Sequence, residues 1–341
     1  MKTLSYDFEY AYGKPELEAT FKSFPEDFKV SENLGFEFTG SGEHICMLVE
    51  KTGLTTNDVA KLLSRHFHIA PRDISYGGLK DRQGITQQWF SLRAGIKREL
   101  EVNDFKHPQI KIIDAQRNIR KIKRGSHSGN SFVIRLRNLS ASPEALQQRF
   151  ELIKTRGVPN YFGLQRFGIN LDNVEQALAM FSGERKVKDR FLRGIYLSAT
   201  RSWLFNTLLS ARVAEQSWDT YIEGDVLALA GSASCFAVDE WDETLDQRLS
   251  SFDIHPTGCL WGSGESKVAK LSEKQEVLLA SEYPELCQGL EKFGLKQERR
   301  ALRLPVENMS IKPEGDTDLM VEFSLAKGTY ATSVLRELIG I

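Results

Sequence analysis

The sequence predicts a protein of the α/β (α+β) class, in which strands and helices follow one another along 341 residues. Short apolar runs and segments in which apolar side chains alternate with others indicate the strands, and apolar side chains at helical spacing indicate the helices between them. Residues 319–325 also alternate as a strand, very late in the chain, and such a strand needs a partner. If the partner lies within the first 155 residues, the middle of the chain is an insertion.

The first strands are expected at residues 28–32, 45–49 and 89–92. After the second strand, Thr55-Thr56-Asn57 offers an N-cap for a helix. The apolar face of that helix is expected to consist of Val59, Leu62, Leu63 and Phe67. Gly77-Gly78 then marks a turn or a close approach of the backbone.

Residues 132–137 alternate between apolar and basic side chains, which predicts a half-buried strand with a basic outer face. Ser142-Pro143 is expected to begin the next helix, with Gly157 as its C-cap. Its inward side chains would be Leu146, Phe150 and Ile153. The turn-rich residues 157–163 mark a change in pattern. Beyond them we expect a long helix near 198–216, mostly helices after Ser272, and a last helix at 331–338 after a turn.

Composition narrows the class of protein. No apolar run approaches the roughly 18 residues of a membrane span, and the N-terminal residues lack a signal-peptide core. We therefore expect a cytoplasmic protein without a membrane partner, and a monomer because no coiled-coil pattern is present. The four cysteines lack CxxC spacing, which predicts reduced core residues rather than zinc ligands. His66 and His68 have no third ligand nearby, so no metal site is expected there.

Charge is unevenly distributed along a chain whose formal net charge is −1. Residues 111–137 hold eight basic side chains and one acid, a formal charge of +7. Such a segment is typical of a protein that binds a polyanion. Residues 239–243 form an acidic cluster that is expected to face solvent.

Two short motifs could carry chemistry. In Lys80-Asp81-Arg82 the flanking cations would favour an ionised carboxylate, and the preceding glycines would admit a bulky substrate. The alternative is a solvated charged turn. In Asn130-Ser131-Phe132 the amide could contact the edge of a base and the ring could stack on it. The alternative there is an asparagine that caps a hairpin turn and a phenylalanine in the core.

Five blocks in order resemble the TruD family of tRNA pseudouridine synthases, over nearly the whole chain from Lys22 to Leu338. The blocks are residues 77–82, 129–132, 157–168, 198–206 and 328–330. The resemblance implies isomerisation of uridine to pseudouridine in tRNA, typically at position 13, without metal or cofactor. It also implies a pseudouridine-synthase core with a mostly antiparallel sheet, formed by residues 1–155 and 306–341. A family-specific α/β domain, residues 156–305, would be inserted in that core.

The resemblance assigns roles residue by residue. The catalytic aspartate falls on Asp81 and the active-site lysine on Lys22. The remaining substrate-binding positions fall on Phe28, Arg82, Asn130, Phe132 and Tyr330. Position 330 is often Phe in relatives, and some relatives have Lys at position 82.

The covalent role of Asp81 stays open at this point: attack on C1′, attack on C6 of the ring, or removal of a proton. Two other functions are also compatible with the residues. One is an RNA-binding protein that helps tRNA to fold without turnover. The other is a glycosidase-type hydrolase, although Asp81 has no acidic partner within its motif.

Overall fold

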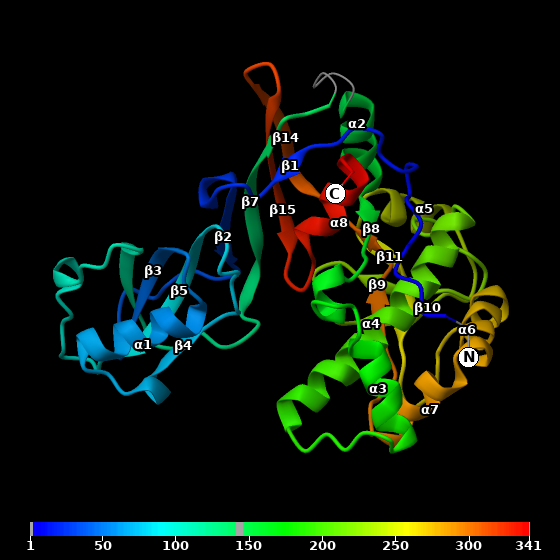
Figure 1. Cartoon of the computed structure of the whole chain (residues 1–341), viewed down its shortest axis with the longest axis horizontal. Helices are drawn as coiled ribbons and strands as arrows, with labels where there is room; N and C mark the ends of the chain where they lie inside the picture. The colour runs from blue at the N-terminus through cyan, green and yellow to red at the C-terminus, as the bar shows by residue number, and fades with distance from the viewer. Residues whose placement is uncertain (1–2, 141–145, 341) are drawn as a thin grey trace. The chain divides into compact units, whose positions relative to one another are not determined.

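A computed structural model describes residues 3–140 and 146–340 of the chain. The chain forms two compact units, whose parts can be followed by colour in Figure 1. Unit 1 contains Met1–Pro15, Glu151–Pro305 and Thr329–Leu338, and unit 2 contains Glu16–Phe150, Val306–Gly328 and Ile339–Ile341. The chain thus leaves unit 2 near the expected boundary at 155 and returns at 305. Two short segments that the sequence analysis placed in the core, residues 1–15 and 329–338, pack in unit 1.

Unit 2 is built on a mixed, mostly antiparallel sheet with the strand order β14-β15-β7-β2-β5-β3-β6. Only β2 and β5 of this path run parallel. The strands are β2 (Phe28–Leu34), β3 (His44–Thr52), β5 (Ile85–Arg93), β6 (Ile110–Asn118), β7 (His127–Arg137), β14 (Glu307–Glu314) and β15 (Asp318–Ala326). Two short strands flank this path: β1 (Thr20–Phe21) pairs with β7, and β4 (Ile74–Tyr76) pairs with β5. The predicted α/β class is confirmed.

The late strand pairs as its position in the chain predicts. β15 lies between β14 and β7, in a register that runs from Leu319 opposite Leu136 to Ala326 opposite Gly129. Its inward side chains are buried and alternate with exposed or half-buried ones. The residues between β7 and β14 therefore separate two parts of one sheet.

Helix α1 (Thr56–Phe67) covers part of this sheet. Thr55 is its N-cap and accepts a hydrogen bond from the backbone of Asp58, whose carboxylate bonds back to Thr55. Val59, Leu63 and Phe67 pack in a core with β3 and β5, as predicted, while Leu62 is only partly buried. The 3-10 turns η1 (Pro25–Asp27), η2 (Pro71–Asp73) and η3 (Val102–Asp104) lie in the connections of unit 2.

Unit 1 is organised around α4 (Arg190–Ala214). This helix begins eight residues before the expected start at 198, because Asp189 caps it and Arg190–Leu197 continue the turn. All five predicted inward side chains, Trp203, Leu204, Leu208, Leu209 and Val213, are buried. They share one core with residues of α3 (Asn173–Ser182), α6 (Lys270–Glu282) and α7 (Pro284–Lys292).

The other elements of unit 1 are short. A sheet with the order β10-β9-β11-β12 consists of β9 (Val226–Leu229), β10 (Cys235–Ala237), β11 (Ile254–Leu260) and β12 (Glu298–Ala301). A further pair joins β8 (Val158–Pro159) to β13 (Arg303–Leu304). The remaining elements are η5 (Leu164–Phe167), α5 (Glu243–Ser250) and α8 (Ala331–Leu338). The acidic residues 239–243 are largely exposed, as expected.

Helix α2 (Gln147–Arg156) has the predicted inward side chains, since Leu146, Phe150 and Ile153 are buried. Gly157 ends it with a positive φ, and its N–H donates to Ile153. The expected start at Ser142-Pro143 lies outside the described residues. Three cysteines, Cys46, Cys259 and Cys287, are free and buried, and Cys235 is half-buried. Within residues 3–140 and 146–340, no helix is long and apolar enough to cross a membrane.

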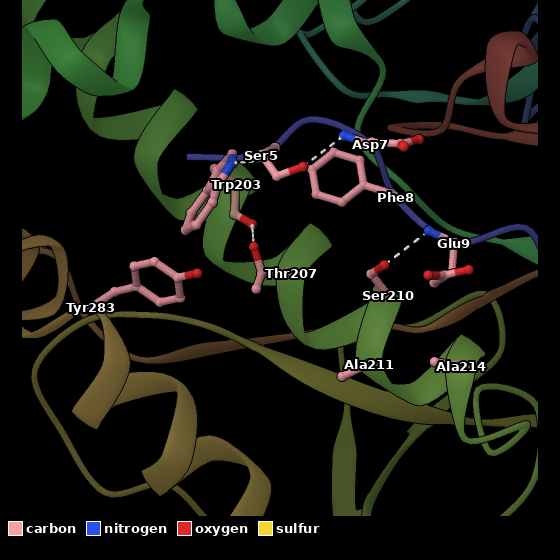
Figure 2. Close-up of a pocket in the computed structure, with 10 residues that line it drawn as sticks. All are labelled: Ser5, Asp7, Phe8, Glu9, Trp203, Thr207, Ser210, Ala211, Ala214 and Tyr283. Atoms are coloured by element: carbon pink, nitrogen blue, oxygen red, sulfur yellow. Dashed lines mark hydrogen bonds between the residues drawn. The ribbon is translucent and has the colours of Figure 1, made fainter. Parts of the chain in front are cut away.

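The N-terminal segment joins unit 1 through α4, as Figure 2 shows. The indole of Trp203 donates to the carbonyl of Ser5, and the backbone N–H of Glu9 donates to the hydroxyl of Ser210, both at 2.9 Å. A hollow of about 230 Å³ lies between this segment and the helix. These hydrogen bonds add to apolar packing, since Phe8 is buried in the core of unit 1 and other side chains of the segment pack against that core: Leu4, Tyr6, Ala11 and Tyr12.

Candidate active site in unit 2

The loop that carries Asp81 connects β4 to β5 and is held by its backbone. The carbonyl of Gly77 accepts a hydrogen bond from the N–H of Gly125 at 2.7 Å, and that of Gly78 accepts one from the Gln88 amide at 2.5 Å. The N–H of Lys80 donates to the hydroxyl of Thr56 at 3.0 Å. These bonds fix the loop before any substrate arrives.

A buried lysine also holds the backbone of this loop. The ammonium group of Lys51 donates to the carbonyl oxygens of Asp81, at 2.7 Å, and Leu54, at 2.8 Å. Only 1% of the Lys51 surface is exposed, and this burial lowers the pKa of its ammonium group to about 8. Lys51 therefore sets the position of the Asp81 backbone, while the Asp81 carboxylate points elsewhere.

The carboxylate of Asp81 is open to solvent and faces one cation. Its Oδ2 atom lies 3.6 Å from Nζ of Lys22, and 65% of its side chain is exposed. Lys22 has a φ of 59°, a rare backbone conformation for a residue other than glycine. The ammonium group of Lys22 lies 3.9 Å from the centroid of the Phe28 ring, a cation–π contact that holds it in place. The Asp81 carboxylate thus lies beside a cation and can still be reached by a large substrate.

The residues that flank Asp81 do not pair with its carboxylate. Lys80 forms a buried ion pair with Glu32 at 2.9 Å, and the other carboxylate oxygen of Glu32 accepts a hydrogen bond from the backbone of Trp89. The guanidinium Nε of Arg82 donates to the carbonyl of Gly53 at 3.0 Å. The cation beside the Asp81 carboxylate is therefore Lys22, from a distant segment, and not one of its two neighbours in the chain.

Phe28 and Phe132 form a buried aromatic wall next to Lys22. Their ring centroids are 6.3 Å apart, and Phe132 also stacks on Phe323 at 5.2 Å. Both side chains are buried, so the core interpretation of Phe132 agrees with the structure. A contact between either ring and the substrate stays a prediction.

Asn130 lies inside β7, opposite Glu32 of β2 and Leu325 of β15, so the hairpin-turn interpretation of this residue is wrong. Its side-chain oxygen is buried and has no hydrogen-bond partner among the described residues. His127, at the start of the same strand, also has an unpartnered buried Nδ1 within the described part of the chain. Burial lowers the pKa of His127, followed by the effect of Lys80.

The position of His127 also explains why residue 77, the first glycine of the loop, has no side chain. A Cβ atom at Gly77 would lie 3.2 Å from both His127 Nδ1 and Glu32 Oε1. A side chain at this position would therefore push the loop away from the Lys80–Glu32 pair.

Tyr330 belongs to unit 1, in the segment that precedes α8. Its hydroxyl accepts a hydrogen bond from the guanidinium group of Arg166. The ring of Phe162 lies beside it, with centroids 6.1 Å apart. Tyr330 is thus part of a cationic and aromatic cluster of its own unit.

The basic segment is only partly available to a polyanion. Arg117 pairs with Glu99, Arg135 with Asp318, and Arg137 with both Asp27 and Asp318. The pairing with Arg137 lowers the pKa of Asp27. The remaining five side chains are exposed and form no ion pair within the described residues: Lys111, Arg120, Lys121, Lys123 and Arg124.

Lys51 and Glu32 were not among the residues singled out from the sequence. Each continues the inward alternation of its strand, after Met47 and Val49 in β3 and after Val30 in β2. A charged residue at an inward position is a signal that could have identified both. Among the residues that the structure describes, no group of three or more His, Cys, Asp or Glu side chains could hold a metal ion.

Comparison with known proteins now gives the family. A family model described as tRNA pseudouridine synthase D (TruD) matches residues 7–185 and 172–338. A tRNA pseudouridine synthase D from Methylococcus capsulatus is 41% identical over 333 residues, which cover 98% of this chain and 94% of the relative. One from Pseudomonas putida is 42% identical over 332 residues, 97% of this chain and 94% of the relative.

The fold agrees with this match. A crystal structure from Methanosarcina mazei, described as a tRNA pseudouridine synthase D (TruD), superimposes with a TM-score of 0.76. The superposition covers 98% of this chain and 96% of that one, at 20% sequence identity. With sequence and fold in agreement, the chain belongs to the TruD family of tRNA pseudouridine synthases.

Proposed function

We propose that this protein converts uridine to pseudouridine in tRNA, at position 13, with Asp81 as the catalytic carboxylate. The observation that carries the proposal is the exposed carboxylate of Asp81, 3.6 Å from Lys22, on a loop whose backbone is fixed by buried groups. Membership of the TruD family supports the reaction class. The open side of Asp81 supports a macromolecular substrate, since a nucleotide of a folded RNA must be turned out of its stack to reach it.

The reaction needs few groups from the protein. The bond between C1′ and N1 of uridine breaks, the ring turns, and C5 joins C1′. C5 then gives up its proton and N1 takes one up, so that the product is an isomer of the substrate. Asp81 supplies the carboxylate, and Lys22 orients it. Because the ring must be retained while it turns, the apolar wall of Phe28 and Phe132 is assigned to its face.

The other predicted residues have complementary roles in this proposal. The unpartnered oxygen of Asn130 is assigned to an N–H group of the base. The exposed guanidinium of Arg82 is assigned to an RNA phosphate, and Tyr330 to the substrate from its place in unit 1. Residues 1–155 and 306–341 would form the catalytic core, and residues 156–305 the inserted family-specific domain.

Substitution of Asp81 tests the proposal. We expect Asp81→Asn to reduce tritium release from tRNA that carries tritium at C5 of uridine to the background rate, because the amide can neither attack nor accept the proton. Binding of tRNA should be retained. The matched control is Asp104→Asn, an exposed aspartate of η3, which should release tritium at the wild-type rate.

The outcomes separate the alternatives. Wild-type protein that binds tRNA without releasing tritium would favour an RNA-binding protein that assists folding. Release by Asp81→Asn at the wild-type rate would refute the catalytic assignment. Mapping pseudouridine in the treated tRNA then tests position 13, and a product at another position would contradict that part of the proposal.

A further inference from the structure

A cationic hollow of about 400 Å³ lies in unit 2, outside the group of residues around Asp81. Three parts of the chain that are distant in sequence line it: the start of β3, the turn η2 with the end of β5, and the loop after β6. The lining side chains are Glu43, His44, Arg72, Asp73, Arg93, Arg120, Lys121 and Lys123. Five cations against two carboxylates leave a formal net charge of +3, which favours an anion over a metal ion.

Pairing within the hollow leaves several cations available. Nε of Arg93 forms an ion pair with Oε2 of Glu43 at 2.9 Å, and Nε of Arg72 lies 3.9 Å from Oδ2 of Asp73. In the described parts of the chain, the three basic residues of the loop after β6 that line the hollow, Arg120, Lys121 and Lys123, form no ion pair. The uncompensated charge of the hollow therefore lies on that loop.

A buried histidine adds a polar group to the wall. His44 is 6% exposed, and its Nδ1 atom is buried without a hydrogen-bond partner in the described residues. Burial lowers the pKa of His44, and Arg93 and Lys121 lower it further against the opposing effect of Glu43. The other ring nitrogen, Nε2, lies 3.6 Å from Oε1 of Glu43.

The basic loop is held in place rather than free to adapt. Between Lys121 and Lys123, the side chain of Ile122 is buried against Cys46 and Trp89. The backbone N–H of Ile122 also donates to the hydroxyl of Ser91 at 3.0 Å. Both lysines are therefore presented by a backbone that need not be ordered on binding, which reduces the entropic cost.

The same loop touches the candidate catalytic loop. The N–H of Gly125 donates to the carbonyl of Gly77, four residues before Asp81. An RNA strand held at the hollow would thus be fixed to a segment that directly supports the Asp81 loop.

We propose that this hollow is a subsite for one backbone phosphate of the RNA substrate, outside the uridine that reacts. That the bound phosphate belongs to RNA rests on the proposed function, whereas the place where it binds rests on the hollow itself. A phosphodiester carries one negative charge and oxygens that accept hydrogen bonds from lysine and arginine, and these two residue types supply the cations of the hollow.

The test is the salt dependence of tRNA binding to the full-length protein. Each phosphate contact contributes roughly 0.7–0.9 to the slope of log Kd against log salt concentration. The double variant Arg72→Gln/Lys121→Gln should bind more weakly and lose about 0.7–0.9 of that slope, because one phosphate is no longer neutralised. The control Lys61→Gln/Lys106→Gln removes the same charge from exposed positions outside the hollow and should keep the wild-type slope.

An unchanged slope in the first variant, or an equal loss of slope in the control, would overturn the subsite. Phosphorus NMR with inorganic phosphate tests whether the hollow binds a free anion instead of an RNA phosphate. If inorganic phosphate binds and tRNA fails to displace it, the subsite is also overturned. Because binding is measured without turnover, a wild-type protein that binds tRNA but releases no tritium would contradict only the proposed function.

Discussion

At the scale of single residues, the position of Asp81 depends on Lys51. Replacement by methionine keeps the length and the apolar stem of the side chain but removes the donor to the Asp81 and Leu54 carbonyls. We expect Lys51→Met to lower kcat/KM for tritium release about tenfold, which corresponds to about 1.4 kcal/mol. The control Lys61→Met, at an exposed position of α1, should have no effect. Wild-type kcat/KM in Lys51→Met would show that the loop is positioned without this lysine.

The same residue predicts a pH dependence of stability. Burial lowers the pKa of Lys51 to about 8 from the ordinary 10.5, so between these values the unfolded chain binds a proton that the folded chain does not. Stability therefore rises with pH across this window, by at most about 1.4 kcal/mol per pH unit. The free energy of unfolding, wild type minus Lys51→Met, should increase from pH 8 to pH 10.5. A constant or decreasing difference would contradict the burial of a charged amine.

The roles of individual residues were only partly readable from the sequence. The resemblance identified Asp81 and Lys22, which the fold brings to 3.6 Å although they are 59 positions apart. Local charge suggested Lys80 as the partner, but Lys80 turns to Glu32, because a buried carboxylate needs a nearby cation. The direction of a side chain depends on tertiary partners, and a tripeptide does not contain that information.

At the scale of elements, two neighbouring threonines at the N-terminus of α1 have different roles: one stabilises the helix, and the other holds the loop of Asp81. Thr55 caps the helix, whereas Thr56 accepts from the N–H of Lys80 and donates to Gln88. We expect Thr56→Val, which keeps the shape of the side chain, to lower kcat/KM about tenfold because it leaves the Lys80 N–H without its acceptor.

The neighbouring position is the matched control. Thr55→Ala should destabilise the protein by about 1 kcal/mol through loss of the cap, with kcat/KM unchanged at a temperature where the protein is folded. Thermal unfolding and tritium release measure the two effects. Equal losses of activity in both variants would mean that the helix, and not the Thr56 hydroxyl, controls the loop.

Strands with a short apolar run or a regular alternation were predictable, and less regular elements were not. The strands at 28–32, 45–49, 89–92 and 319–325 lie within β2, β3, β5 and β15. β6 was missed. Many positions of this edge strand are exposed or half-buried, so its sequence shows no clear period of two. Its basic residues suggested only a binding surface. The start of α4 was missed, although Asp189 is of a residue type that commonly caps a helix and its side chain accepts hydrogen bonds from the backbone of Phe191 and Leu192.

At the scale of the whole molecule, the chain builds one sheet from two distant parts. The pairing of β15 with β7 could be expected because an isolated late strand needs partners. That residues 3–15 belong to unit 1 was not predicted, although apolar and aromatic residues alternate with mostly polar ones from Leu4 to Tyr12. Phe8 of this segment is buried in the core of unit 1, and hydrogen bonds to α4 add to that packing. The shared sheet has a consequence for stability: the core under the candidate site includes side chains of β15, which lies far from β7 in the sequence.

Phe323 tests this dependence. It is buried in β15 and stacks on Phe132, 191 positions earlier. Truncation of a buried phenylalanine costs about 3–5 kcal/mol, a large part of the stability of an ordinary domain. We expect Phe323→Ala to reduce the protection of β7 and β15 amides against hydrogen exchange by that amount, whereas the exposed Ile96→Ala should leave it unchanged. Protection of β7 within 1 kcal/mol of the wild type would mean that the first half of the chain forms a stable sheet without its last strand.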